Sequence, residues 1–196
     1  MFYDYLCPFV YRASVLLQNA SRSGERNLKV GWRYFSLAQV NAKDALWTAW
    51  DAPESERVKG RLAFKAAEAA RRQGRFEDLH MPLLEARHRD RLDIDNVGVV
   101  EKVASDAGLD IERFRRDIAS GDILEALARD HREGVSQRGV FGTPTLVFNG
   151  ASSAYVRLSE PPGPDEAVRL LDKLVSVAAD EPQILEIKRP VRPAQD

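Results

Sequence analysis

The alternation of apolar and polar positions predicts strands near both ends of the chain and helices between them. An aromatic run over residues 2–6 is typical of a buried strand, and the apolar periodicity of residues 9–19 predicts the helix that follows it. Residues 29–35 alternate, with Trp32 and Tyr34 on one face, which predicts a second strand. A strand, a helix and a second strand in this order favour a right-handed parallel unit.

Residues 41–134 have helical periodicity interrupted by several breaks, so we expect an all-helical block. The expected helices run from Pro53 to about Gly74, from Phe76 to His88 with Pro82 inside, from a cap at Asp95 or Asn96 to Gly108, from a cap at Asp110 to Gly121, and from there to about Gly134.

The pattern returns to strands after Pro144. Residues 145–149 predict a buried strand, Asn149 and Gly150 predict a hairpin turn, and residues 153–158 would form the antiparallel partner. After a proline-rich break, residues 165–179 predict a closing helix.

The order of these elements predicts an α/β fold in which an all-helical insertion interrupts one core. We assign residues 1–40 and 135–179 to the core, 41–134 to the insertion and 180–196 to an extended tail. Within the tail, residues 184–187 could add an edge strand.

Composition narrows the function classes. The 196 residues are 44% hydrophobic, which is enough for a core without disulfides, and the net charge of −1 gives no electrostatic reason to expect nucleic-acid binding. No apolar run approaches the roughly 18 residues of a membrane helix, and no secretory signal pattern is visible. With a single cysteine, these features favour a reducing compartment and therefore a cytoplasmic location.

That cysteine, Cys7, carries the strongest chemical signal. It begins the sequence Cys7-Pro8-Phe9-Val10, in which a dithiol redox protein would have its second thiol at position 10. Cys7 lies where the first strand should meet the first helix, and the free N–H groups and positive dipole of a helix start favour a thiolate. The residues therefore predict a nucleophile without a resolving partner.

Together with the element order, Cys7-Pro8-Phe9-Val10 and the segment Gly139-Val140-Phe141-Gly142-Thr143-Pro144-Thr145 resemble the DsbA-like form of the thioredoxin fold. The likeness is strongest to cytoplasmic FrnE-type oxidoreductases. The chain is also similar to the related kappa-class glutathione transferases and 2-hydroxychromene-2-carboxylate isomerases. The resemblance implies that the bond between Thr143 and Pro144 is cis, that both residues face Cys7, and that the backbone before the proline receives an extended substrate.

The resemblance also implies roles for individual residues. Cys7 is the expected catalytic nucleophile. The residues expected to bind substrate are Pro8, Phe9, Val10, Thr143 and Pro144. From their positions in the chain, and not from the resemblance, Tyr11, Trp47 and Trp50 could line a pocket over Cys7, the alternative being that they pack in the core or in a hydrophobic seam between insertion and core. His80, His88 and His131 are too scattered for a zinc pattern, so no metal site is expected.

The leading hypothesis is a thiol-disulfide oxidoreductase that uses Cys7 with an external low-molecular-weight thiol, such as glutathione, and has no tightly bound cofactor. A second hypothesis is a glutathione transferase or isomerase in which Cys7 assists a bound thiol. A third is a non-catalytic module that holds an extended peptide. The expected partners are a small thiol, a disulfide or electrophile, and a peptide in the third case. A homodimer is also expected, with residues 184–187 as the candidate contact.

Overall fold

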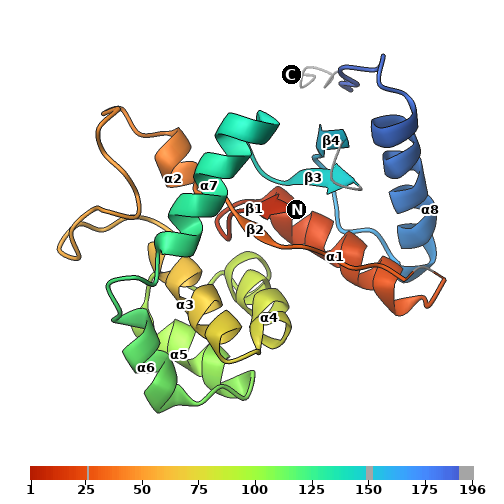
Figure 1. Ribbon diagram of the computed structural model, residues 1–196. Coiled ribbons are helices and arrows are strands. Elements are labelled where there is room, and N and C mark those ends of the chain that lie inside the picture. Colours follow the sequence, from red (N-terminus) through yellow and green to blue (C-terminus); the bar gives the residue numbers. More distant parts are fainter. Residues whose placement is uncertain (26, 149–151, 190–196) are drawn as a thin grey trace, which may run out of the picture.

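The computed structural model describes residues 1–25, 27–148 and 152–189, and a sheet of short strands lies at its centre (Figure 1). The described strands are β1 (Phe2–Tyr3), β2 (Arg33–Tyr34), β3 (Thr145–Phe148) and β4 (Ser152–Tyr155). They are ordered β2-β1-β3-β4. The β1 strand runs parallel to β2 and antiparallel to β3, and β3 runs antiparallel to β4. The first two strands therefore form the predicted parallel unit.

The helices fall into a pair beside the sheet and a block inserted between β2 and β3. Their bounds are α1 (Pro8–Arg22), α2 (Leu37–Val40), α3 (Arg61–Arg72), α4 (Phe76–His88), α5 (Val97–Asp106), α6 (Ile111–Ile118), α7 (Glu125–Arg138), α8 (Pro164–Val175) and the π-helix η1 (Ser176–Asp180). In the described part of the chain, no helix is both long and apolar enough to cross a membrane.

Helices α1 and α8 pack against each other, whereas α7 packs on β2 (Figure 1). The helices α3 to α6 form a bundle that joins the core through contacts of α4 with α1. This arrangement confirms the predicted fold class, an α/β core with a helical insertion before β3.

An aromatic cluster fills the space between the sheet and the insertion. Tyr3 from β1 lies edge-on to Tyr5, with ring centroids 5.2 Å apart, and packs at 4.9 Å from the ring of His80 on α4. The ring centroid of Phe64, from α3, is 6.1 Å from that of Tyr5. Because these side chains are almost completely buried, they fix how the insertion sits on the strand that leads to Cys7.

The first two strands are shorter than predicted. After Tyr3 the chain turns, because Asp4 accepts the backbone N–H of Leu6 on its carboxylate at 2.8 Å and that of Cys7 on its carbonyl at 3.1 Å. In the second strand only Arg33 and Tyr34 pair with β1.

The start of the helical block was predicted wrongly. Residues 41–60 form turns, and α3 begins at Arg61 rather than near Pro53. Gly60 interrupts the helix because its backbone has φ of 77°, in the left-handed region, and its N–H is held by the carboxylate of Asp95 at 2.9 Å. The short helix α2, capped by Ser36, was not predicted.

Other helix ends follow their local signals. Asn96 caps α5 and Asp110 caps α6, and Gly108 adopts φ of 75° just beyond α5, as the sequence predicts. In contrast, α7 does not end at Gly134 but continues to Arg138.

The C-terminal part also differs from prediction. The β4 strand begins at Ser152 and ends at Tyr155, and the closing helix continues as η1 to Asp180. Residues 184–187 form no strand, and Leu185 is 95% exposed because no element of the described chain covers it. The hairpin turn expected at Asn149 and Gly150 lies outside the described residues.

Candidate active site

Cys7 is the residue that immediately precedes α1. Its backbone is extended, with φ of −84° and ψ of 115°, and Pro8 occupies the first turn of the helix, where a missing N–H costs no hydrogen bond. The thiol is 5% exposed, and its Sγ donates to the carbonyl oxygen of Thr143 at 3.1 Å. The fold therefore brings the nucleophile predicted at residue 7 against the segment that precedes β3.

The Thr143–Pro144 peptide bond is cis. The carbonyl of Pro144 accepts the backbone N–H of Val156 at 3.1 Å, so it belongs to the hydrogen bonding of the sheet. Thr145 donates its hydroxyl to the carbonyl of Gly142 at 2.8 Å. By contrast, the hydroxyl of Thr143 is buried and has no hydrogen-bond partner among the described residues. This segment thus presents one carbonyl and one unused hydroxyl beside the thiol.

Position 10 is part of the core. The Val10 side chain is 0% exposed, and its N–H donates to the carbonyl of Cys7 at 3.0 Å in the first turn of α1. The chain contains no cysteine besides Cys7, so no intramolecular disulfide can form. Positions 7 and 10 are thus both buried, and they differ in that only Cys7 contacts the cis-proline segment through a hydrogen bond.

The exposed side of the first turn carries Pro8 and the half-buried ring of Phe9. Two guanidinium groups lie over that ring, with the Cζ of Arg157 at 4.1 Å and that of Arg12 at 5.2 Å from its centroid. The ring of Tyr11 stacks on His88 from α4 at 5.8 Å. Phe9 and Tyr11 thus connect the Cys7 turn to the segment after β4 and to the insertion.

Asp4 fixes the turn that leads to Cys7. Its two carboxylate oxygens accept the N–H groups of Leu6 at 2.8 Å and Leu37 at 2.7 Å, so it links β1 to the start of α2. Burial raises the pKa of Asp4 to about 6, against the opposing effect of these two hydrogen bonds. A weaker contribution to the increase comes from the nearby charge of Asp95.

His88 holds the same turn from the other side. Its Nε2 lies 2.8 Å from the carbonyl oxygen of Tyr5, and because a carbonyl can only accept, Nε2 carries the proton. Burial lowers the pKa of His88, and the positive charges of Arg87, Arg91 and Arg12 add to the decrease. A neutral imidazole therefore anchors α4 to the backbone next to Cys7.

The two tryptophans proposed as pocket residues make their contacts elsewhere. The indole N–H of Trp47 donates to Glu56 at 2.9 Å, and Trp50 packs against His131 at 5.4 Å. Among the described residues, no hydrogen bond or ring contact joins either tryptophan to Cys7. Their contacts with the described residues therefore lie outside the immediate surroundings of Cys7.

Sequence analysis missed Asp4, His88 and Arg157 as neighbours of the site. Asp4 gave a usable signal, since a single acidic residue inside an aromatic run must be paired if it is buried. His88 and Arg157 gave none, because their positions depend on how α4 and the segment after β4 pack against α1.

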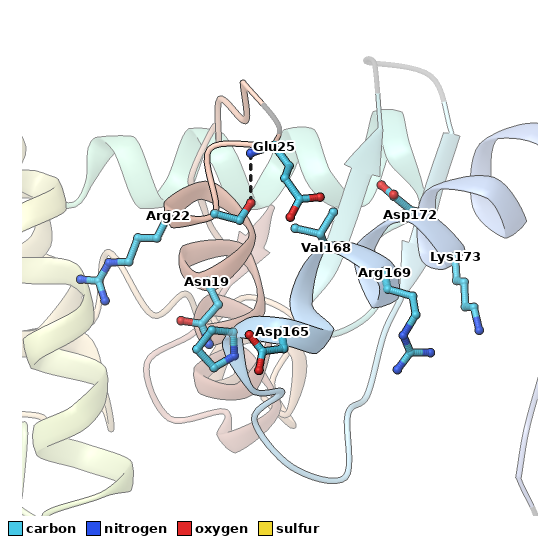
Figure 2. Close-up of a pocket in the computed structure, with 10 residues that line it drawn as sticks. Asn19, Arg22, Glu25, Asp165, Val168, Arg169, Asp172 and Lys173 are labelled. Atoms are coloured by element: carbon cyan, nitrogen blue, oxygen red, sulfur yellow. Dashed lines mark hydrogen bonds between the residues drawn. The ribbon is translucent and has the colours of Figure 1, made fainter.

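A large hollow lies away from Cys7, between the end of α1 and the start of α8 (Figure 2). Its volume is about 900 Å³, and acidic and basic side chains alternate around it, including Arg22, Asp165 and Arg169. Neither Cys7 nor Thr143 lines it, so it is separate from the thiol site. Within the described part of the chain, no three His, Cys, Asp or Glu side chains are grouped to hold a metal ion.

The fold and the site together define a class: thioredoxin-fold proteins in which a cysteine at the start of a helix faces a cis-proline segment. Within that class, the DSBA-like thioredoxin domain family matches residues 1–166. The chain belongs to this family, whose members are thiol-disulfide oxidoreductases.

The individual proteins that resemble this chain do so at low sequence identity. An uncharacterized protein of Mycobacterium tuberculosis is 23% identical over 194 residues, covering 98% of this chain and 81% of that protein. The Na⁺/H⁺ antiporter NhaA 1 of Mycolicibacterium vanbaalenii is 29% identical over 149 residues, which are 75% of this chain but 21% of the antiporter. Among solved structures, a "probable DsbA oxidoreductase" of Streptomyces coelicolor superposes with a TM-score of 0.63 at 18% identity, covering 98% of this chain and 92% of that chain. At that identity it shows the fold alone.

Proposed function

We propose that the protein is a thiol-disulfide oxidoreductase that works through Cys7 alone and depends on an external low-molecular-weight thiol. The observation that carries this proposal is the contrast between positions 7 and 10. Cys7 lies at the helix start against Thr143, whereas Val10 occupies the position of a resolving thiol and is completely buried. Membership of the family supports thiol-disulfide exchange as the class of reaction. The valine at position 10 restricts that reaction to one protein thiol.

The cycle has two exchange steps. The Cys7 thiolate attacks one sulfur of a disulfide RSSR, so that a Cys7–SR bond forms while the S–S bond breaks and RS⁻ leaves to take a proton from solvent. A second thiol, R′SH, loses its proton to solvent and attacks the mixed disulfide on the sulfur of R. The products are R′SSR and the regenerated Cys7 thiolate, so the protein is unchanged overall.

Intact-mass analysis after incubation with several oxidised biological thiols tests the proposal. We expect one adduct for each protein molecule, located at Cys7 by peptide mapping and removed by a small reduced thiol. Because Cys7 is the only thiol, a Cys7→Ser variant provides a matched control that should gain no mass. If Cys7 forms no adduct with any disulfide, the proposal is wrong.

The same variant separates this function from a transferase or isomerase that binds glutathione without forming a disulfide. The serine hydroxyl can still donate a hydrogen bond to a bound thiol, so such an activity would persist in Cys7→Ser. Loss of all activity in that variant, with adduct formation in the wild type, would support the exchange mechanism.

One observation favours peptide binding as a second candidate function. Phe141 is 68% exposed and Tyr155 is 40% exposed, and their rings lie 5.1 Å apart next to Gly142 and Thr143. An exposed aromatic pair is a common anchor for peptides. If the site receives peptides, Phe141→Ala should weaken peptide binding while leaving the reaction of Cys7 with small disulfides unchanged. Equal loss of both would contradict a peptide role for this pair.

A further inference from the structure

Positive side chains converge on the first turn of α1 from two directions. From the segment after β4, Arg157 lies over the ring of Phe9 at 4.1 Å, and Arg12 lies near the same ring at 5.2 Å. Phe9 is two positions from Cys7, so both guanidinium groups lie beside the turn that begins with the thiol.

The second direction is the end of α4. There the ring of His88 stacks on Tyr11 and its Nε2 donates to Tyr5, two positions before Cys7. Arg87, Arg91 and Arg12 all act electrostatically on His88. Arg12 therefore belongs to both groups, and the four arginines 12, 87, 91 and 157 are named here the arginine rim.

No carboxylate of residues 1–25, 27–148 or 152–189 neutralises the rim through an ion pair. In the described residues, none of its four arginines forms an ion pair with a carboxylate. The nearby acids already have partners, since Glu85 and Asp90 pair with Arg89 at 3.0 and 2.8 Å. Asp93 likewise pairs with Arg57 at 3.0 Å. A concentration of unpaired cations beside a reactive residue attracts anionic ligands and raises their association rate.

The backbone of Arg91 shows how one charge of the rim can be removed with little structural cost. Its φ is 61°, and it is the only residue other than glycine with a positive φ in the described chain. A glycine would adopt this conformation without steric cost, whereas an arginine is disfavoured there. Replacing Arg91 by glycine thus removes the charge while keeping, or easing, the local backbone.

We propose that the small thiol or disulfide that reacts with Cys7 is an anion bearing carboxylate or phosphate groups, and that the arginine rim attracts and holds those groups. This inference rests on the proposed function, because it specifies the substrate class of the same site. The exchange step is unchanged: the Cys7–S bond forms as the S–S bond of the anion breaks, and the departing half leaves as a thiolate.

Three disulfides test the inference, each with two methylene groups between the sulfur and a terminal group of different charge. They are 3,3′-dithiodipropionate, 2-hydroxyethyl disulfide and cystamine, which carry negative, zero and positive charge. The rate at which each forms an adduct with Cys7 is divided by its rate with a free small thiol. In 50 mM salt we expect the anion to react about tenfold faster than the cation after this correction. The preference should largely disappear in 1 M salt, where the Debye length is about 3 Å.

Single substitutions identify which arginines cause the preference for the anionic disulfide. Arg157→Gln and Arg91→Gly suit this purpose because neither side chain makes a hydrogen bond or ion pair to another described residue. Each should lower the anion-to-cation rate ratio by about threefold, and the rate with 2-hydroxyethyl disulfide shows how much of any change is independent of substrate charge. Arg22→Gln is the matched control. Arg22 lies at the opposite end of α1 from Cys7, and its replacement changes the net charge by the same amount.

The outcomes are distinct. Equal corrected rates for the three disulfides, or an equal effect of Arg22→Gln and the rim variants, would overturn the inference while leaving the reaction of Cys7 intact. Absence of any adduct, even from the neutral disulfide, would overturn the proposed function itself, and the inference with it. A second comparison between glutathione disulfide and coenzyme A disulfide then shows whether the rim favours carboxylates or phosphates.

Discussion

The Sγ of Cys7 lies 3.1 Å from the carbonyl oxygen of Thr143, which is 136 positions further along the chain. The thiol donates in this contact, so the carbonyl that precedes the cis proline is held by the side chain of the expected nucleophile.

Variants of Cys7 should show the structural value of this contact. Cys7→Ala leaves the Thr143 carbonyl without its donor, and we expect a loss of about 1 kcal/mol in the free energy of unfolding. Cys7→Ser retains a donor and should lose less. Urea denaturation of the three proteins measures the difference, and both variants should be inactive in disulfide exchange. Equal stability of the two variants would show that the contact contributes nothing to folding.

Val10→Cys should convert the protein to a dithiol. Side chains three positions apart on a helix have Cβ atoms about 5–6 Å apart, so modest adjustment allows a disulfide. We expect the variant to lose both free thiols on mild oxidation and to become independent of an external thiol. Val15→Cys is the control, because eight positions on a helix span about 12 Å and exclude a bond to Cys7. A persistent mixed disulfide in Val10→Cys would contradict the expectation.

The unused hydroxyl of Thr143 gives a matched pair of variants. Thr143→Val removes a buried hydroxyl that has no partner among the described residues, and we expect unchanged stability or a gain of about 1 kcal/mol. Thr145→Val removes a hydroxyl bonded to Gly142 at 2.8 Å and should cost about 1 kcal/mol. If the Thr143 hydroxyl binds substrate, Thr143→Val should also exchange disulfides more slowly. Destabilisation of Thr143→Val would contradict the assignment.

Asp4 should make stability depend on pH. Its pKa is about 6 in the folded protein against 3.8 as the reference value, so the folded state binds more protons between these values. The contribution of Asp4 to the free energy of unfolding is therefore largest below about pH 4. It decreases as pH rises through 6, by at most about 3 kcal/mol. His131 acts in the opposite direction, because burial lowers its pKa to about 4 and stability rises as its unfolded form loses the proton.

Asp4→Asn isolates the carboxylate, since His131 titrates in both proteins. The amide is a neutral isostere of the protonated carboxyl, so we expect Asp4→Asn to match the wild type within about 1 kcal/mol at pH 4, where Asp4 carries its proton. As pH rises to 7 the variant should become the more stable protein, by at most about 3 kcal/mol, because only the wild-type side chain ionises. Chemical denaturation across this range measures it, and parallel stability curves would contradict the expected titration of Asp4.

The sequence alone determined the features that depend on neighbouring residues. Asn96 and Asp110 cap their helices because a side-chain oxygen bonds an N–H two or three residues away, and Gly108 marks a helix end because it has no Cβ. The position of Cys7 before Pro8 likewise defined the start of α1, and the missing second cysteine limited the chemistry. Resemblance to a known family, rather than periodicity, paired Cys7 with Thr143.

Only the tertiary structure decided what surrounds the thiol. Helix α3 begins after Gly60 and not near Pro53, because Gly60 has a left-handed backbone and Asp95, from a distant loop, binds its N–H. His88 and Arg157 reach the Cys7 turn because α4 and the segment after β4 pack beside α1. Burial, desolvation and long-range hydrogen bonds depend on which helices and strands pack together. Patterns of neighbouring residues do not contain that information. The sequence thus determined that Cys7 is the only cysteine of the chain, and packing decided which charges lie beside it.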